Sequence, residues 1–519
     1  MSFDSYYWHE WDIPDPRLGE LCRKRASGEG GVDTFFELLR SDSVVAVGVA
    51  LDHYRYEESL TRFGRDNPFE ELEPTVLEVA RGVLATPPHG MSHASPNPSA
   101  PARSSSTQKG ETPMNLELVS RKLIDDDSLS VAETTDRIAA WLSAQPDRGA
   151  AEAVACLLST QDRRVAECAA LYLALLPGLH EEKTRAARRL RDHEDLVAAA
   201  GRLVPWLRTE LLEEMVSDYV QGGDPDAPSV DVVYEVGLYQ PGLLRPYLSS
   251  IEDPDIRLGM MSGAPDGDVP GLVDKWREED EIGALDLLAR MRTEAAAQAL
   301  LGLREEISEP ADWKTFVEMA GRLPDSAERA GHQPAYMGFV ADRGDSPHSM
   351  GGTYPGEVPL CPLCARPAAR VLTLSAEDLP YSLSGDPSFF WYTCRCYAAD
   401  SVTVKITPDG LGVFDGPCGS GETDAYIVPG ARTLTLETHP NQLGISLDAT
   451  GGNARHQVGG LPRWITPEPQ PRCPECTCVM RFLASIDSGP SPFGRMNLDG
   501  TLYGFWCDSC QVSSVRHQA

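Results

Sequence analysis

Apolar residues recur every three or four positions through much of the first 330 residues, as in helices that bury one face. Several stretches place a short amphipathic segment, a polar turn and a second segment rich in Ala, Val and Leu in succession. GAAEAVACLLSTQD followed by RRVAECAALYLALL is one example. Two such units match at an offset of 120, where Asp42, Val45, Ala46, Ala50 and Leu51 correspond to Asp162, Val165, Ala166, Ala170 and Leu171. A hairpin of this size cannot bury its own apolar face, so the pattern predicts stacked helical hairpins.

The stretch TPPHGMSHASPNPSAPARSSSTQKGETP, from Thr86 to Pro113, interrupts this pattern with Pro, Ser and Gly. It has almost nothing apolar to bury, so it is expected to be a disordered linker over residues 86–113. The linker separates an N-terminal helical segment, residues 1–85, from a larger set of helical repeats, residues 114–330. An irregular helical bundle is the alternative to a regular stack.

From residue 331 onward the pattern changes to short alternating runs separated by turn signals such as PDG and VPG. The runs are ARVLTLS, SVTVKI, DAYIV, RTLTLE and TLYGFW. Alternation of this kind predicts antiparallel strands. The predicted fold class is therefore a multidomain α + β protein, a helical solenoid followed by a β-rich domain over residues 331–519.

The helical hairpins resemble HEAT-type repeats, in particular the divergent HEAT-like proteins of actinobacteria. The similarity covers roughly residues 15–85 and 115–325. The resemblance implies an α-solenoid scaffold that presents a long concave surface to other macromolecules.

Charge and the N-terminus bear on partners and compartment. The formal net charge is −32, and residues 331–519 hold 12 Lys/Arg and 18 Asp/Glu, which leaves −26 on residues 1–330. Such a field repels nucleic acid and anionic lipid and attracts basic proteins. MSFDSYYWHEWDIPDP has no basic or apolar leader pattern, and no apolar run is long enough to span a membrane, so we expect a cytoplasmic protein.

Four cysteines near the end of the chain have the spacing of a metal site. Cys473-x2-Cys476 is followed after thirty residues by Cys507-x2-Cys510. Two tight turns of this kind can bring four thiolates around one zinc ion, and four sulfurs leave no open position for catalysis. The spacing therefore predicts a structural zinc site. Cys478 falls outside the pattern and is expected to be a spare, buried thiol.

An earlier cluster repeats this layout, with Cys361 and Cys364 followed by Cys394 and Cys396. Each cluster is preceded by a Gly-Gly pair and a proline, which are Gly351, Gly352 and Pro355 in one case and Gly459, Gly460 and Pro462 in the other. We interpret the two clusters as an internal duplication of a zinc-binding hairpin. The single-residue spacing of Cys394 and Cys396 departs from the pattern, so the first site is expected to be looser, to recruit Cys418, or to be partly lost.

The segments QVGGLPRWITPEPQPRCPECTCVMRFLASID and GTLYGFWCDSC resemble two related families, the bacterial YwqG-like domain of unknown function and the eukaryotic programmed-cell-death protein 2 family. The matched residues are Gly459, Gly460, Pro462, Trp464, Cys473, Cys476, Phe482, Leu483, Cys507 and Cys510. The eukaryotic family implies a role in escorting a ribosomal protein, which here is analogy at the level of the fold.

The sequence contains no Walker motif, HExxH, GxSxG elbow or strand-anchored GxGxxG. It favours a non-catalytic, protein–protein interaction adaptor or chaperone-like scaffold with a basic protein partner and structural zinc. Two alternatives stay open. One is a nucleic-acid-binding regulator that uses the zinc ribbon, although the domain has no dense basic stripe. The other is an enzyme of unrecognised class that acts on a small molecule.

Overall fold

The computed structural model describes residues 115–126, 129–145, 148–225, 227–279, 282–324, 333–394, 401–414, 416–419, 426–446, 456–498 and 500–519. The chain divides into two units, Met1–Glu111 and Thr112–Ala519, and all described residues belong to the second. The helical segment and the linker expected over residues 1–85 and 86–113 therefore lie outside the described residues.

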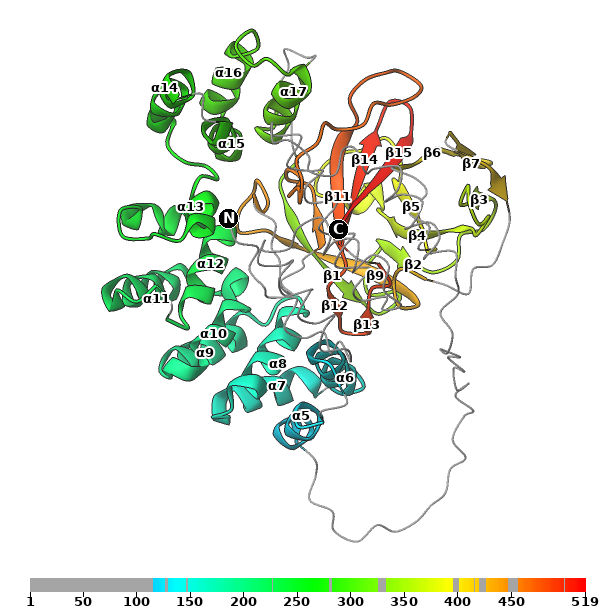
Figure 1. Cartoon of the computed structure of the whole chain (residues 1–519). Coiled ribbons are helices and arrows are strands. Elements are labelled where there is room, and N and C mark those ends of the chain that lie inside the picture. The colour runs from blue at the N-terminus through cyan, green and yellow to red at the C-terminus, as the bar shows by residue number, and fades with distance from the viewer. Residues whose placement is uncertain are drawn as a thin grey trace, which may run out of the picture. The chain divides into compact units, whose positions relative to one another are not determined.

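The second unit begins with a row of helices, seen on the left of Figure 1. Their bounds are α5 Leu116–Ile124, α6 Val131–Ser143, α7 Gly149–Ser159, α8 Arg163–Ala174, α9 His180–Arg191, α10 Val197–Gly201, α11 Thr209–Gly222, α12 Val230–Tyr239, α13 Pro254–Met260, α14 Val269–Glu279, α15 Ile282–Met291, α16 Glu294–Gly302 and α17 Pro310–Met319. Most helices that follow one another in the chain contact one another, for example α5 and α6, α7 and α8, α11 and α12, and α14 and α15.

Local capping explains where several of these helices begin. The Ser130 side chain accepts a hydrogen bond from the backbone N–H of Glu133, and the Glu133 carboxylate accepts one from the N–H of Ser130, which completes a capping box before α6. Asp162 caps α8, the second helix of the next hairpin, as Ser130 caps α6.

The rest of the unit is a β domain. Its strands are β1 Tyr336–Ala341, β2 Ser349–Gly351, β3 Val358–Pro359, β4 Ala368–Thr373, β5 Ser388–Tyr392, β6 Ser401–Thr407, β7 Gly410–Val413, β8 Cys418–Gly419, β9 Ala431–Thr438, β10 His456–Val458, β11 Arg481–Asp487, β12 Pro490–Ser491, β13 Gly494–Arg495, β14 Thr501–Cys507 and β15 Val512–Gln518. Eleven of them form one antiparallel sheet in the order β5-β4-β2-β9-β1-β10-β11-β14-β15-β6-β7. The sheet curls into a half-barrel, so that the Ser513 hydroxyl on β15 donates to the Ser388 carbonyl on β5 over 2.6 Å.

The order of the strands shows that two halves of the domain exchange a strand. The first half, residues 333–419, contributes β1, and the second half, residues 426–519, contributes β9; these two strands pair in the middle of the sheet. β1 also pairs with β10 of the second half, and β9 also pairs with β2 of the first. Because each half completes the sheet of the other, neither half has a complete sheet by itself.

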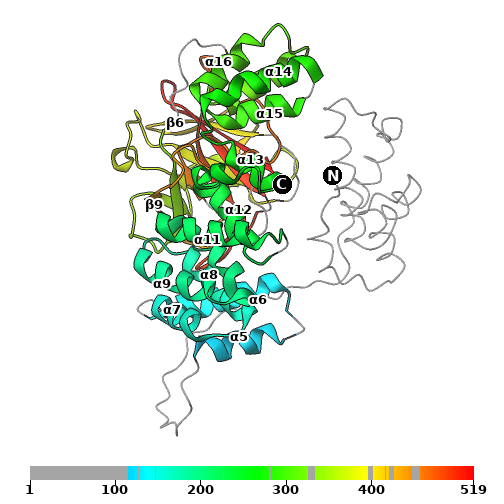
Figure 2. The same cartoon turned by 90° about the vertical axis from the view of Figure 1, so that its left-hand side faces the viewer.

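The two faces of the sheet have different partners. On β1, Met337 and Phe339 belong to the core that is shared with α5 to α13, whereas Val340 belongs to the interior of the half-barrel. A second mixed core joins α14 to α17 with β11, β14 and β15. In Figures 1 and 2 the row of helices accordingly lies along one side of the sheet.

Buried polar side chains fix this arrangement. Arg292, directly after α15, donates to the backbone carbonyls of the β domain at Leu443, Gly444, Ile445 and Pro462. Burial lowers the pKa of its guanidinium to about 9. In the opposite direction, a side chain of the β domain binds the helical row: the Glu437 carboxylate on β9 accepts hydrogen bonds from the Gly178 N–H and the Trp206 indole. The helical row and the β domain are thus joined by satisfied polar contacts as well as by apolar packing.

The predicted fold class is confirmed: a helical region precedes an antiparallel β half-barrel that carries cysteine clusters. Among the predicted strands, DAYIV is wrong within its described part, because residues 426–428 form no strand. Ile427 and Val428 instead insert into the half-barrel core, and Pro429-Gly430 turns the chain immediately afterwards. The described helices share both of their buried cores with residues of the β domain. No described helix combines the length and apolar character that a bilayer span requires.

Candidate metal centre

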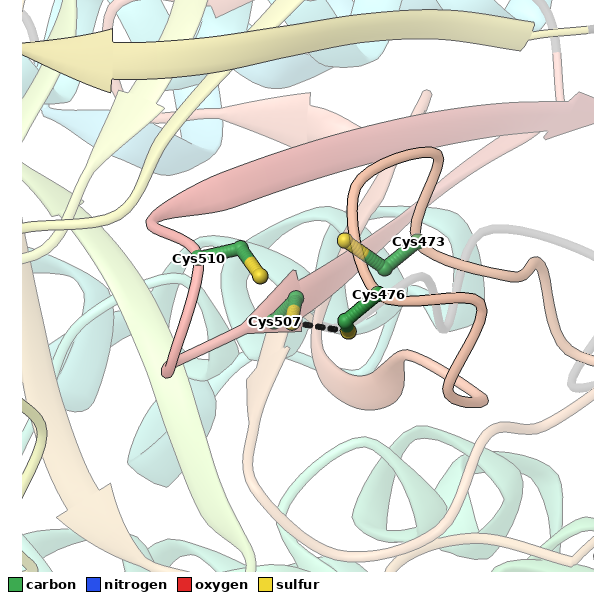
Figure 3. A group of neighbouring side chains, drawn as sticks. All are labelled: Cys473, Cys476, Cys507 and Cys510. Atoms are coloured by element: carbon green, nitrogen blue, oxygen red, sulfur yellow. Dashed lines mark hydrogen bonds between the residues drawn. The ribbon is translucent and has the colours of Figure 1, made fainter.

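The four cysteines of the later cluster meet in space, and we call this group the second centre (Figure 3). The sulfur atoms of Cys473, Cys476, Cys507 and Cys510 all lie within 4.8 Å of one another, and those of Cys476 and Cys507 are 3.6 Å apart. In a tetrahedral zinc site with Zn–S bonds of 2.3 Å, two sulfurs lie about 3.8 Å apart. The four side chains are therefore close enough together to hold one tetrahedral ion.

The first pair of ligands lies on a tight turn, the first knuckle, at residues 473–478. The N–H of Thr477 donates to the Cys473 carbonyl over 2.8 Å, and the N–H of Cys473 donates to the Cys478 carbonyl over 2.9 Å. Thr477 has a φ of 63°, a left-handed conformation that a non-glycine residue adopts at some cost. The turn bends the chain back on itself, and an isolated bridge between Arg472 and Val479 closes it.

The second pair of ligands lies on the turn between β14 and β15, the second knuckle, at residues 507–510. The turn again ends on a left-handed residue, Gln511, with a φ of 56°. Cys507 pairs with Val512 at the end of the β14–β15 ladder, so the two strands hold the knuckle rigidly against the first one. Two knuckles from separate parts of the chain therefore supply two sulfurs each.

Burial of the second centre is unequal among its four cysteines. Cys473 and Cys507 are buried, whereas Cys476 and Cys510 are half-buried. The buried pair belongs to the same core as Trp313 and Phe316 of α17. The centre thus lies where the helical row and the half-barrel meet.

The thiols of the second centre differ in their protonation. The backbone N–H of Cys478 is the main cause that lowers the pKa of Cys476, to about 6, whereas burial raises the pKa of Cys473 to about 12. A divalent cation that binds all four as thiolates removes this difference, because metal ligands must be deprotonated. The four-sulfur group is therefore suited to a cation.

The position of Cys478 differs from the prediction. Its thiol is exposed, not buried, and it lies outside the four-sulfur group. The reason is the turn itself: Cys478 supplies its carbonyl and its N–H to the knuckle, which leaves its side chain on the outer surface. A hydrogen bond to Cys476 raises the pKa of the Cys478 thiol.

The earlier cluster forms a smaller group, the first centre. The sulfurs of Cys361, Cys364 and Cys394 lie within 4.8 Å of one another, and Cys361 is buried while Cys364 is exposed. Cys396, the predicted fourth ligand, lies outside the described residues. Cys418 is not part of the group; its exposed thiol donates to the Glu357 carboxylate over 3.4 Å.

The first centre repeats the knuckle of the second, bond for bond. The N–H of Ala365 donates to the Cys361 carbonyl over 2.8 Å, the N–H of Cys361 donates to the Arg366 carbonyl over 2.8 Å, and Ala365 has a φ of 55°. The Leu360–Pro367 bridge closes this turn as Arg472–Val479 closes the other. The duplication inferred from spacing therefore extends to the backbone.

The strands that follow these two matching turns, at Cys361 and at Cys473, are also repeated. β4 pairs with β5 and β11 pairs with β14, and each ladder skips one residue at the corresponding place, Val371 and Leu483 respectively. The Gly-Gly pairs before the clusters all have φ between 63° and 74°. A Cβ at Gly459 would lie 2.2 Å from the Pro334 carbonyl oxygen, so this turn requires glycine.

Sequence reasoning did not single out Asp508, which lies between the ligands of the second knuckle. Its carboxylate accepts hydrogen bonds from the Ser384 N–H and hydroxyl and from the Trp506 indole. Burial favours the neutral acid, but these donors hold the pKa of the Asp508 carboxyl below its ordinary value. The contact ties the second knuckle to a loop of the first half, a pairing for which the sequence carries no local signal.

Comparison with known proteins adds one distant relative. The uncharacterized protein YpfL of Salmonella typhimurium is 26% identical over 208 residues, which are 37% of this chain and 43% of YpfL. The chain thus spans less than half the length of that relative. No protein-family model and no solved structure matches the chain. The resemblances to HEAT-like repeats and to the two zinc-domain families therefore remain predictions.

Proposed function

We propose that this protein is a non-catalytic interaction scaffold in which zinc bound at the second centre stabilises the β domain. The observation that carries the proposal is the convergence of four cysteine sulfurs from two knuckles within 4.8 Å. Thiolates are soft ligands that favour zinc, and four of them fill a tetrahedral coordination sphere. Zinc held in this way supplies folding free energy and leaves no position for a reacting molecule.

The first centre is proposed as a second, weaker zinc site. Three described thiols converge there, and its knuckle has the same backbone bonds as that of the second centre. Exposure of Cys364 leaves this centre with less protein packed around it. Water competes more easily for an ion in such a site, which favours weaker retention.

Metal analysis of the full chain tests this part of the proposal. We expect two zinc equivalents per chain, falling to one in Cys473→Ser and to one in Cys361→Ser. In a weak chelator the wild type is expected to lose zinc from the first centre and to keep the zinc ion bound at the second centre, which Cys473→Ser lacks. Zinc content that is unchanged in Cys473→Ser contradicts the proposal.

The partner we propose is a basic protein that binds the exposed side of the helical row. α11 presents an acidic surface on that row, formed by Glu210, Glu213, Glu214 and Asp218. Arg191 of α9 forms ion pairs with Glu214 and Asp218. The nearby pair of Arg208 and Glu181 is exposed, and exposed pairs of this kind contribute little stability. An acidic surface of this kind raises the association rate of a basic partner and makes the complex sensitive to salt.

A charge-reversal experiment tests the partner. The double variant Glu210→Lys, Glu213→Lys is expected to lose most salt-sensitive capture of basic polypeptides in a pull-down with the zinc-loaded chain. The matched control is Glu377→Lys, Asp409→Lys, which makes the same change in net charge on exposed residues of the β domain. Equal loss in both double variants contradicts a specific surface on α11.

A further inference from the structure

A pocket of about 790 Å³ opens beside the second centre. Its wall includes Cys478 from the first knuckle and Arg472 directly before it. Asp508 and Ser509 from the second knuckle and Ser384 from the first half of the β domain also line the wall. The end of the helical region closes another side at Gly321. Pockets of this volume hold small molecules or short peptide segments.

The register of the first knuckle determines which side chains face this pocket. The bridge pairs Arg472 with Val479, which places Gln470 opposite Arg481 two positions further along. Alternation along the two chain segments puts all four residues on one face, and all four line the pocket. Arg472 and Arg481 are therefore diagonal neighbours, about 7–8 Å apart, on the same face.

The floor of the pocket is apolar. Leu461, Phe482, Leu483 and Trp506 line it and are each less than one-tenth exposed. Phe482 also packs in the core that holds the second centre, and Leu483 and Trp506 pack inside the half-barrel. The floor is thus held by two cores and forms a fixed base, while the half-buried Leu383 and Val479 expose apolar surface to the pocket.

The charges in the pocket are arranged unevenly. The Asp508 carboxylate is occupied by its three hydrogen bonds from Ser384 and Trp506. The zinc tetrathiolate proposed above lies behind the wall, because Cys507 forms part of the lining. Arg472 and Arg481 are both exposed. Nη1 of Arg472 donates to the Thr477 carbonyl over 3.0 Å, which holds this guanidinium at the pocket wall. A guanidinium has five N–H donors, so each arginine can also donate to an incoming anion. An anionic group is therefore favoured at the arginines and an apolar group above the floor.

We propose that this pocket binds a peptide segment of a partner protein in which an acidic side chain flanks a large apolar one. The carboxylate would accept paired hydrogen bonds from Arg472 and Arg481, whose planar guanidinium groups suit that geometry. The apolar side chain would lie against Leu383 and Val479, which line the pocket and are half-buried, and would release water from both surfaces. The inference rests on the proposed structural zinc, since both knuckles form the wall.

Binding of a defined peptide tests the site. The probe is a fluorescein-labelled Gly-Glu-Leu-Trp-Glu-Gly peptide with a C-terminal amide, so that its carboxylates are on side chains, titrated with the full-length, zinc-loaded protein. Arg481→Glu is expected to weaken binding about 10-fold or more, because truncating or reversing one member of a charge pair costs that much affinity. Arg366→Glu is the matched control: it makes the same change on the exposed knuckle of the first centre, away from the pocket.

Two further measurements separate this inference from its premises. Peptide binding is expected to slow the alkylation of Cys478, an exposed thiol in the pocket wall, as followed by peptide mass mapping. A peptide with Gln in place of both Glu residues is expected to bind about 10-fold more weakly and to protect Cys478 less. Zinc content is measured on every variant. If zinc is retained in Arg481→Glu and affinity is unchanged, the pocket proposal is overturned while the zinc proposal stands; absence of zinc in the wild type overturns the zinc proposal first.

Discussion

The two halves of the β domain contain the same knuckle in different surroundings. In the second half the knuckle lies beneath α14 to α17, within a core that includes Trp313 and Phe316. In the first half the knuckle carries Leu363, which is 72% exposed, and it packs over a small core of local strands. The same backbone turn can therefore contribute differently to the stability of the domain, because the protein packed around a metal site determines how much structure is disrupted when the metal is lost.

The halves also differ in their buried charge. Arg463 and Asp487 form an ion pair in the second half, and both side chains are less than one-tenth exposed. Asp487 corresponds to Ser375 in the first half, since the N–H of each donates to the buried histidine of its own half, His456 and His348 respectively. The second half thus combines a covered metal centre with a buried ion pair. We expect disruptions of the second half to cost more than matching disruptions of the first.

The largest expected difference is in the metal ligands. Cys473→Ser should destabilise the unit by several kcal/mol, because a structural zinc ion contributes its binding energy to folding and this one lies in a core shared with the helices. Cys361→Ser should cost clearly less, because its centre is partly exposed. Urea denaturation of the two zinc-loaded variants, monitored by intrinsic fluorescence, measures both losses in the free energy of unfolding.

The control for this comparison is Cys478→Ser, a change in the same knuckle at an exposed thiol outside the four-sulfur group. It is expected to leave zinc content and stability unchanged. Equal destabilisation by Cys473→Ser and Cys361→Ser would show that burial does not decide the weight of each centre.

The buried ion pair gives the next largest effect. Asp487→Ser gives the second half the serine that the first half has at the equivalent position, Ser375. The buried guanidinium of Arg463 then lacks the carboxylate that it pairs with. Loss of one member of a buried pair costs about 3–5 kcal/mol. The double variant Arg463→Met, Asp487→Ser should recover much of this loss in a thermal or urea unfolding series. A single variant that unfolds like the wild type would contradict a buried, charged Arg463.

Much of this organisation could be predicted from the sequence. The change from helical to alternating periodicity near residue 331 located the transition between Met319, the end of α17, and Tyr336, the start of β1. Cysteine spacing and the Gly-Gly pairs predicted the knuckles because both are local signals. These features depend on residues within a few positions of one another, where spacing determines geometry.

Long-range features could not be predicted in this way. The exchange of β1 and β9 between the halves joins strands that are nearly one hundred residues apart, and β1 contains no strict alternation. The Arg463–Asp487 pair and the contact of Asp508 with Ser384 depend on that arrangement. A single sequence contains no spacing rule for such pairs, since their proximity follows from the whole sheet.

A smaller effect is expected where equivalent positions of the two halves touch. Gly504 on β14 corresponds to Phe389 on β5, and a Cβ at Gly504 would lie 2.8 Å from the Phe389 ring. Gly504→Ala should therefore destabilise the unit by about 1–3 kcal/mol, the usual cost of overpacking a core. Phe389→Leu combined with Gly504→Ala should restore part of it, as measured by urea midpoints. Additive losses in the double variant would contradict direct contact.

The smallest expected effect is a dependence on pH from the first half. Burial lowers the pKa of His348, whose Nδ1 accepts a hydrogen bond from the Ser375 N–H, although Asp378 and Asp386 oppose the shift. A histidine that is harder to protonate when folded binds more protons in the unfolded chain, so stability should fall as the pH drops below about 6.5 and through the lowered folded value. His348→Gln keeps an acceptor but cannot titrate, so its stability should decline less between pH 7 and pH 5. The difference between the unfolding free energies of wild type and His348→Gln, plotted against pH, isolates the contribution of His348. If the two proteins lose stability in parallel as the pH falls, His348 makes no contribution to acid sensitivity.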